Sequence, residues 1–298
     1  MYSIVVPLYN EEEVILESYK RLKTVMDNVN EPYELVFVND GSRDKTLEMA
    51  RKLAENDKNL KIISFSRNFG HQIAVTAGLE HAVGEAVVVI DADLQDPPEV
   101  MPEMFAKWKE GWQVVYGQRL KRQGETLFKK ATAKLFYRGL RALTEVEMPV
   151  DAGDFRLYDR AVVEAMKKMP EHNRYLRGMV SWLGFRQTSV SFTRQERFAG
   201  VTKYSLKKMI NFAADGVTSF SQKPLKIGIF FGVFFCVSAV VIALLQLVFQ
   251  SEIACWAAAI IFIQGIVLIC GGIQGAYMAR VYDEVKNRPL YVVSEKIN

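Results

Sequence analysis

Cysteine is scarce in this sequence, and the few cysteines do not lie where they could stabilise a soluble domain. Of 298 residues only three are cysteine, and Cys236, Cys255 and Cys270 all lie in long uncharged stretches near the C-terminus. This placement argues against a disulfide framework or a zinc site in the soluble part of the chain, and it agrees with a reducing compartment.

Other features are missing as well, and each absence narrows the class of protein. No G-x-G-x-x-G run follows a predicted strand, which excludes a nucleotide-dependent dehydrogenase. Residues 1–7 lack the basic stretch, apolar core and cleavage site of a secretory signal, so we expect the first domain to stay in the cytoplasm. The formal net charge is only +4, which is too small to indicate nucleic-acid binding but fits a protein that lies against anionic lipid.

Charge is absent from two long runs near the C-terminus. Residues 227–249 and 253–279 contain no Asp, Glu, Lys, Arg or His, and each run is longer than the roughly 20 residues that a membrane-spanning helix needs. We therefore predict two transmembrane helices, and uncharged runs of this length disfavour a pair of buried core helices. Basic residues precede the first run and follow the second, so the positive-inside rule predicts that both ends of the chain are cytoplasmic.

Strand and helix patterns alternate in the first 90 residues. Short β-branched runs predict strands at 2–7, 33–38, 60–65 and 86–90, and apolar residues at helical spacing predict helices at 12–29, 42–55 and 72–83, the second with Ser42 as its N-cap. The strands are apolar without alternation, which is typical of strands buried on both faces. The pattern predicts an α/β fold in which helices cover both faces of a mostly parallel sheet.

Polar residues follow each predicted strand. Tyr9, Asn10 and Glu11 come after the first strand, and residues 39–42, 66–68 and 91–93 come after the next three. Ligands of such sheets bind beyond the carboxyl ends of the strands. An apolar wall from Leu8 and Tyr9, with acceptors from Glu11 and Asp40, suits a base and a ribose, so we predict a nucleotide pocket at this edge.

The fourth of these loops carries a carboxylate pair. Asp91 and Asp93, with Gln95 two residues further on, are spaced so that their oxygens can converge on one hard cation, Mg²⁺ or Mn²⁺. Such a cation would bridge a diphosphate and neutralise charge on a leaving nucleotide. Two aspartates in a turn are also common as N-caps and loop formers, and the spacing alone leaves both interpretations open.

Two later segments are amphipathic. Residues 203–224 carry an apolar stripe at helical spacing with lysines beside it, which predicts an interfacial helix. Residues 121–141 are basic with apolar side chains between the charges, and by themselves they fit a solvated surface helix equally well.

Four runs in order carry a resemblance to a known family: VVPLYNEEE, VNDGSRDKT, FSRNFGHQIAVTAGL and DADLQDPPE. Together they resemble glycosyltransferase family 2, and within it the polyprenyl-phosphate branch of bactoprenol glucosyltransferases and dolichol-phosphate mannose synthases. The resemblance extends through residues 116–119, 151–156 and 197–205 to the paired C-terminal runs. It therefore covers essentially the whole chain.

The resemblance implies a GT-A type fold, which is a Rossmann-like, mostly parallel sheet with helices on both faces. It divides the chain into a cytoplasmic catalytic domain (1–202), an amphipathic interfacial segment (203–224), two C-terminal transmembrane helices (225–280) and a cytoplasmic tail (281–298).

The resemblance also assigns residues to roles. The metal-binding positions are matched by Asp91, Asp93 and Gln95, and those around the base and ribose by Pro7, Tyr9, Glu11 and Asp40. Arg197, with Lys203 in the same motif, matches the basic residue that closes over the donor's diphosphate, which Asp91 also meets. Arg119 matches the region that meets the acceptor phosphate, as do Lys134 and Arg138 in the basic helix.

Asp154, acting beside Asp93, is expected to lie nearest the sugar, where it would orient hydroxyl groups or assist attack. The alternative for Asp154 is a capping or salt-bridging aspartate beside Arg156, and Asp151 is a weaker candidate for the same role. The three histidines are scattered along the chain, and none of them is interpreted as a metal ligand or a base: His71, His81 and His172.

The implied activity is transfer of one hexose, with inversion, from a nucleotide diphosphate sugar to undecaprenyl phosphate or a similar polyprenyl phosphate at the inner membrane. UDP-glucose is the favoured donor; a GDP-mannose donor and a catalytically silent nucleotide-sugar-binding scaffold are the alternatives. A processive polysaccharide synthase is disfavoured because the chain has no Q-x-x-R-W motif and only two predicted spans. Gly271 and Gly275 form a G-x-x-x-G pair compatible with a homo-oligomer in the membrane.

Overall fold

The computed structural model describes residues 1–120, 152–193, 231, 234, 237–238 and 253–298. The chain divides into two compact units. The first comprises Met1–Leu127, Glu147–Ser205 and Pro289–Asn298, and the second comprises Phe128–Val146 and Leu206–Arg288. Each unit is described by itself below.

The first unit is built on an eight-stranded sheet with the strand order β7-β5-β6-β4-β1-β2-β3-β8. The strands are β1 (Tyr2–Leu8), β2 (Tyr33–Asn39), β3 (Leu60–Phe65), β4 (Ala86–Val89), β5 (Val114–Arg119), β6 (Ala152–Asp159), β7 (Gln187–Phe192) and β8 (Val293–Ile297). The first four strands are parallel to one another, as the sequence predicts. By contrast, β6 runs antiparallel to both β4 and β5, and β8 runs antiparallel to β3.

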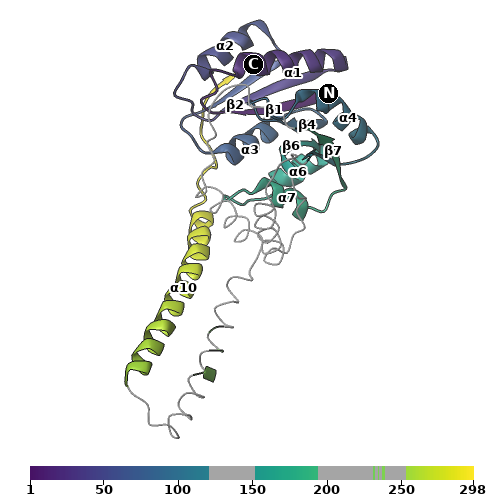
Figure 1. Cartoon of the computed structure of the whole chain (residues 1–298). Helices are drawn as coiled ribbons and strands as arrows, with labels where there is room; N and C mark the ends of the chain where they lie inside the picture. Colours follow the sequence, from purple (N-terminus) through teal and green to yellow (C-terminus); the bar gives the residue numbers. More distant parts are fainter. Residues whose placement is uncertain (121–151, 194–230, 232–233, 235–236, 239–252) are drawn as a thin grey trace. The chain divides into compact units, whose positions relative to one another are not determined.

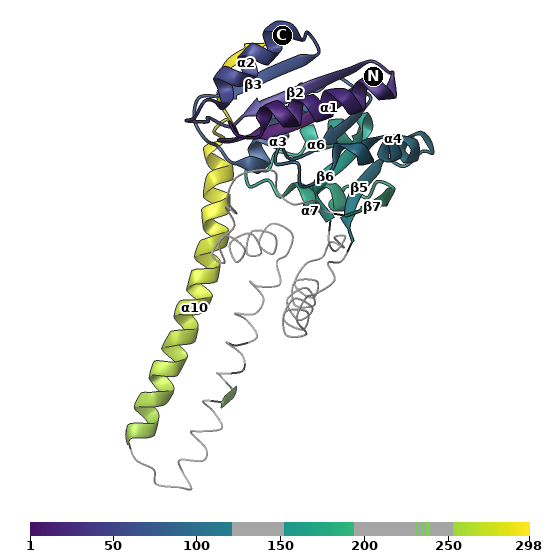
Figure 2. The same cartoon turned by 45° about the horizontal axis from the view of Figure 1, so that its top comes forward.

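Helices cover both faces of the sheet (Figures 1 and 2). Helices α1 (Ile15–Val29), α2 (Thr46–Asn56) and α4 (Met101–Lys109, after the 3₁₀ turn η1, Pro98–Val100) pack on one face. Helices α3 (His71–His81), α6 (Arg160–Lys167) and α7 (Leu176–Trp182) lie on the other. The mostly parallel α/β fold with two covered faces is therefore confirmed.

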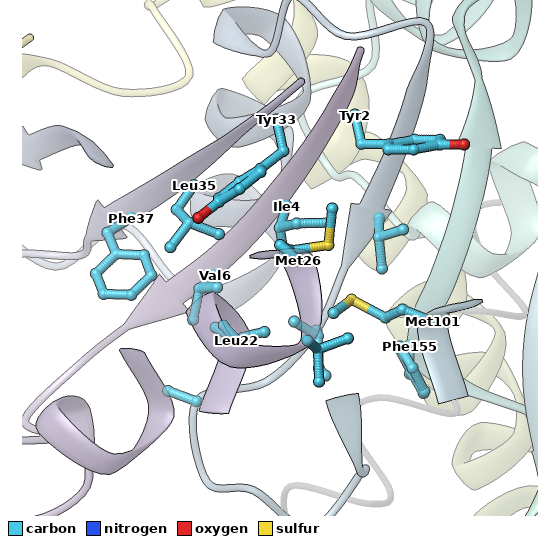
Figure 3. Close-up of a cluster of buried hydrophobic side chains, with 14 of the residues drawn as sticks. Tyr2, Ile4, Val6, Leu22, Met26, Tyr33, Leu35, Phe37, Met101 and Phe155 are labelled. Carbon is cyan, nitrogen blue, oxygen red and sulfur yellow. The ribbon is translucent and has the colours of Figure 1, made fainter. Parts of the chain in front are cut away.

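The core on the α1 face is made by alternate residues of the central strands. Figure 3 shows Ile4 and Val6 of β1 beside Leu22 and Met26 of α1. At the end of this cluster the Tyr2 ring stacks on Phe105, with 4.0 Å between ring centroids. All seven residues of β1 are buried, and burying one large apolar side chain stabilises a fold by about 1.5–3 kcal/mol.

Helix α3 lies unusually close to the opposite face of β1. A Cβ atom on Gly78 would stand 2.1 Å from Val5 Cγ1, so only glycine permits this approach. The close packing fixes the axis of α3 and with it the position of its first residue, His71. This residue lies at the edge where the parallel strands end.

Helix α2 begins at Thr46, so the sequence-based expectation of an N-cap at Ser42 is wrong. Ser42 Oγ instead accepts a hydrogen bond from the Asn10 backbone N–H at 3.0 Å, and Arg43 N–H donates to Asn10 Oδ1 at 2.9 Å. The serine therefore joins the loop after β2 to the loop after β1. A local pattern predicts a cap because it takes no account of such a contact across 32 residues.

The last residues of the chain complete the sheet, although no pattern in the sequence predicts a strand there. β8 pairs with β3, and the Tyr291 ring stacks on Phe65 with 4.9 Å between centroids. Tyr291 donates a hydrogen bond to Glu80 at 2.5 Å, and Arg51 forms an ion pair with Glu295. The segment expected to be a tail thus has its final residues in the sheet of the first unit.

In the second unit, helix α10 (Ile253–Lys286) spans 34 residues, or about 50 Å at 1.5 Å per residue. Its segment Phe262–Lys286 is long and apolar enough to cross a membrane, and none of it is buried within the protein. Leu268 and Ile269 are among its exposed apolar side chains. The first predicted span (227–249) and the interfacial segment (203–224) lie almost entirely outside the described residues, so the pair of transmembrane helices stays a prediction.

We expect the stability of the first unit to depend on its C-terminal strand. A chain that ends at Leu290 exposes the backbone edge of β3 and the Phe65 ring, and its melting temperature in detergent should fall by roughly 5–10 °C. Glu295→Gln removes only the partly exposed ion pair with Arg51 and should change the melting temperature by about 2 °C or less. Equal melting temperatures for the truncated and full chains would contradict this role.

Candidate active site

Polar side chains gather at the carboxyl edge of the parallel strands, as the sequence predicts. Asp91 follows β4, and Asp40 follows β2 directly. The loop after β3 leads into His71 at the start of α3. Asp154, on β6, belongs to this edge because its strand runs antiparallel and begins where β4 ends.

The centre of the site is a cluster of charged groups from four separate segments. His71 Nε2 lies 3.2 Å from Asp154 Oδ2 and 3.7 Å from Asp91 Oδ1. Arg177 Nε, on α7, donates a hydrogen bond to Asp154 Oδ1 at 2.8 Å, and Gln72 Nε2 donates to Asp154 Oδ2 at 3.3 Å. The structure therefore brings together Asp91 and Asp154, two of the predicted site residues, with His71 between them.

The surroundings of Asp154 keep it ionised. Its side chain is only 12% exposed, and this burial acts to raise its pKa. The nearby Arg177 guanidinium and the hydrogen bond from His71 outweigh burial and hold the pKa well below its usual range. Asp154 is thus a negatively charged acceptor at neutral pH and a poor proton acceptor. Its salt-bridge partner is Arg177, whereas Arg156 Nε donates to the Gly153 carbonyl.

The pKa values of His71 and Asp91 are shifted by the same neighbouring charges. Desolvation lowers the pKa of His71, but the hydrogen bond to Asp154 and the charge of Asp91 raise it to about 9. A pKa in this range favours the imidazolium form of His71 at neutral pH. Burial, with the charges of Asp154 and Asp93, raises the pKa of Asp91 to about 6, although His71 opposes the change.

The residues at the end of β4 fit a divalent cation chemically. Carboxylates near Asp91 raise its pKa by repulsion, and an added cation would relieve this repulsion. In the described part of the chain no three Asp, Glu, His or Cys side chains already converge as metal ligands. Asp93 Oδ1 accepts a hydrogen bond from Gln95 N–H at 3.1 Å within their turn. The set of Asp91, Asp93 and Gln95 stays a prediction.

Asp40 is buried and satisfied by the loop that precedes α3. Its carboxylate accepts hydrogen bonds from the backbone N–H groups of Phe69 (2.6 Å) and Gly70 (3.0 Å) and from Asn68 Nδ2 (2.9 Å). Burial raises its pKa against the effect of these bonds. Asp40 thus anchors the residues directly before His71, and its contact with a base or ribose stays a prediction.

The other predicted nucleotide-binding residues lie at the end of β1. Pro7 is buried within the strand, whereas Tyr9 and Glu11 are partly exposed in the loop after it. Glu11 N–H donates to Thr46 Oγ1 at 2.8 Å, which ties this loop to the start of α2.

Arg119, the last residue of β5, forms an ion pair with Asp96, with 3.1 Å between Nη2 and Oδ2. The remaining predicted site residues lie outside the described residues: Lys134, Arg138, Asp151, Arg197 and Lys203.

Sequence reasoning assigned no role in this site to four residues, of which it named only His71: His71, Gln72, Asp96 and Arg177. A signal existed for His71 and Gln72, because they follow the loop after β3 and so share the edge on which the other loops converge. Asp96 follows Gln95 directly. Arg177 carries no local signal, since it reaches Asp154 only through the packing of α7.

An open, mostly parallel sheet with carboxylates and cationic side chains at its carboxyl edge is typical of α/β proteins that bind a charged ligand there. Comparison with known proteins narrows this class. Residues 3–166 match the model of the family "Glycosyl transferase family 2". The chain belongs to glycosyltransferase family 2 and is an enzyme.

Two relatives match nearly the whole chain. It is 53% identical over 301 residues to "Uncharacterized glycosyltransferase YkcC" of Bacillus subtilis, which covers 99% of this chain and 93% of the relative. It is 39% identical over 301 residues to the "Bactoprenol glucosyl transferase" of Shigella phage SfII, which covers 98% and 97% respectively. The second of these relatives supports the polyprenyl-phosphate branch expected from the motifs.

One solved structure shows the same fold. Glucosyl-3-phosphoglycerate synthase from Mycobacterium tuberculosis, in complex with Mn²⁺, UDP and glucosyl-3-phosphoglycerate, superposes with a TM-score of 0.50 at 20% identity. The match covers 73% of this chain and 77% of that one. It supports the GT-A type assignment.

We expect the contribution of His71 to stability to depend on pH. Because its folded-state pKa of about 9 lies above the ordinary value of 6.5, the stabilisation is complete at pH 6.5 and below and is lost as the pH rises through 9. The side chain is 42% exposed, so solvent screening limits this part to on the order of 1 kcal/mol, or roughly 2–4 °C. Melting curves of wild type and His71→Gln between pH 6 and 10 measure it.

The matched comparison uses the Asp154→Asn background. Without the Asp154 carboxylate, the pH-dependent part of the His71→Gln difference should shrink, because only the more distant Asp91 then raises the pKa of His71. An undiminished pH dependence in that background would assign the effect to other groups.

Proposed function

We propose that the enzyme transfers one glucose residue, with inversion, from UDP-glucose to undecaprenyl phosphate. The observation that carries the proposal is the cluster in which His71 lies between Asp91 and Asp154 at the carboxyl edge of the sheet. A carboxylate suited to a cation and a carboxylate held ionised for the sugar thus lie within reach of one ligand. The relatives named bactoprenol glucosyl transferase support this acceptor and this sugar.

The donor would lie across the ends of β1, β2 and β4. Pro7, Tyr9, Glu11 and Asp40 would surround the base and ribose. Asp91, Asp93 and Gln95 would hold Mg²⁺ or Mn²⁺, which supplies charge neutralisation for the departing nucleotide diphosphate. Arg197 and Lys203 would close over the diphosphate and exclude water from it.

The acceptor requires little activation. A phosphate monoester has its second pKa near 6 and is largely dianionic at neutral pH. One of its oxygens attacks the anomeric carbon as the bond from that carbon to the UDP oxygen breaks, so UDP leaves and the product is inverted. Arg119, Lys134 and Arg138 would draw the acceptor phosphate to the donor by charge.

The electrostatics of Asp154 support an orienting role. A carboxylate whose pKa is held low by Arg177 and His71 accepts hydrogen bonds well and takes up protons poorly. Because the phosphate nucleophile carries no proton that must be removed, the reaction does not need Asp154 as a base. We assign it to the sugar hydroxyls.

The path of the chain supports a multi-pass arrangement in the inner membrane. The chain leaves the first unit at Ser205 and returns to it at Pro289, and β8 lies in the same sheet as β7. A segment that starts and ends on one side of a membrane must cross it an even number of times. If α10 provides one crossing, residues 227–249 provide the other, and the catalytic domain and both termini are cytoplasmic.

The reaction is tested with membranes that contain the enzyme, undecaprenyl phosphate, Mg²⁺ or Mn²⁺, and labelled UDP-glucose, UDP-galactose or GDP-mannose. UDP-glucose should label the lipid. Asp91→Asn should reduce labelling by at least about 100-fold, since it removes a cation ligand. The control residue is Asp57, a buried carboxylate that is ion-paired with Lys23 outside the site. The Asp57→Asn variant should retain labelling.

The outcomes separate the alternatives. Labelling from GDP-mannose alone would identify mannose rather than glucose as the transferred sugar, and the class of reaction would stay the same. An absence of lipid labelling from every donor, with nucleotide-sugar binding intact, would favour a silent scaffold.

The topology is tested with single cysteines in a chain whose three native cysteines are replaced by alanine. Ser251→Cys, between the two apolar runs, should react with a membrane-impermeant maleimide in intact bacterial cells. Asn298→Cys should react only after the cells are opened. Labelling of both positions in intact cells would refute the proposed orientation.

A further inference from the structure

Arg119 is held in a defined place before any ligand arrives. It is the last residue of β5, where the neighbouring strand β6 begins; the register pairs Gln118 with Ala152. Its side chain is 31% exposed, and its Nη2 donates a hydrogen bond to Asp96 Oδ2 at 3.1 Å. Among the described residues, Arg119 Nε is buried and has no hydrogen-bond partner, so the exposed part of the side chain is the end of the guanidinium.

Asp96 is suited to fix a guanidinium. Its side chain is only 2% exposed, and a buried carboxylate without a cationic partner is strongly destabilising. The pair is therefore retained in the folded protein. Asp96 also lies in the loop that carries Asp93 and Gln95, so a single short loop joins the predicted cation ligands to Arg119.

Gly153 provides the space for the guanidinium. A Cβ atom at this position would stand 3.0 Å from Arg119 Nη2 and 3.4 Å from Cζ. Any larger residue would push the guanidinium away from β6. The carboxylate of Asp96 and the bare backbone of Gly153 thus limit where the Arg119 side chain can lie.

We propose that Asp96 and Gly153 are positioning residues that hold the partly exposed Arg119 guanidinium where it meets the phosphate of the acceptor. This inference rests on the proposed function. A long arginine side chain that is already immobilised loses less rotamer freedom when phosphate binds, so binding is tighter. Asp96 lies in the loop of Asp93 and Gln95, so its ion pair with Arg119 also fixes the position of the acceptor site relative to the donor site.

The test compares acceptor and donor kinetics in the full-length enzyme. Asp96→Asn keeps the shape and removes the charge, and it should raise the KM for undecaprenyl phosphate by about tenfold. The KM for UDP-glucose should stay within about twofold of wild type. Gly153→Ala moves the guanidinium without changing any charge. It should likewise raise the KM for undecaprenyl phosphate more than the KM for UDP-glucose.

A double-mutant cycle assigns the effect to Arg119. In the Arg119→Lys background, Asp96→Asn should add little, because the residue that it positions is already lost. The matched control is Asp57→Asn, which breaks another buried pair, Lys23 with Asp57 at 3.1 Å, away from the site. It should lower the melting temperature and leave both KM values unchanged.

Binding of farnesyl phosphate, measured by calorimetry on the full chain in detergent, tests the positioning role without turnover. Wild type should bind it about tenfold more tightly than Asp96→Asn. If wild type binds the phosphate but transfers no sugar, the proposed function fails and the positioning role stands. Equal affinity of wild type and Asp96→Asn, absence of binding by wild type, or an equal rise of both KM values would overturn the inference.

Discussion

Five aspartates lie at the carboxyl edge of the sheet, Asp93 among them, and the neutralisation of their charges is the constraint that organises the site. Each is partly or fully buried, and a buried charge is stable only beside a partner. Asp154 is paired with Arg177 and His71, Asp96 with Arg119, and Asp40 with the backbone of residues 69 and 70. Among the described residues, the cationic partner of Asp91 is the more distant His71, at 3.7 Å, which leaves Asp91 the least neutralised of those four.

Because these aspartates have different partners, they take different roles in the site. A carboxylate already satisfied by backbone N–H groups serves as an anchor, as Asp40 does for the loop before α3. A carboxylate paired with arginine fixes that arginine, as Asp96 does, or stays ionised beside a ligand, as Asp154 does. Asp91 is partly exposed and has a raised pKa, which is the property expected of a group that exchanges a proton for a metal ion.

The scaffold makes this arrangement possible by setting backbone positions rather than by supplying chemistry. The approach of α3 to β1 at Gly78 places His71, and the antiparallel strand β6 carries Asp154 to the edge reached by β4. The final strand β8 returns the chain to the sheet after α10. The segments that precede Leu206 and follow Arg288 therefore belong to the same folded unit, which links the catalytic fold to its proposed place at the membrane.

The sequence by itself determined the parallel half of the sheet and the chemistry of its edge. Strands β1 to β4 are short apolar runs whose local pattern is sufficient, and the loops after them must meet because parallel strands end together. Asp91 and Asp40 were therefore recognisable from their positions. The resemblance to the family identified Asp154 as well, because each family motif is a run of consecutive residues that can be recognised in the sequence.

Only the tertiary structure decided which side chains complete that edge. β8 forms because β3 offers an unpaired edge, and Arg177 meets Asp154 because α6 and α7 fold back over the sheet. His71 became an imidazolium because two carboxylates surround it. Each of these depends on contacts between residues far apart in the chain, which no local pattern of charge or hydrophobicity encodes.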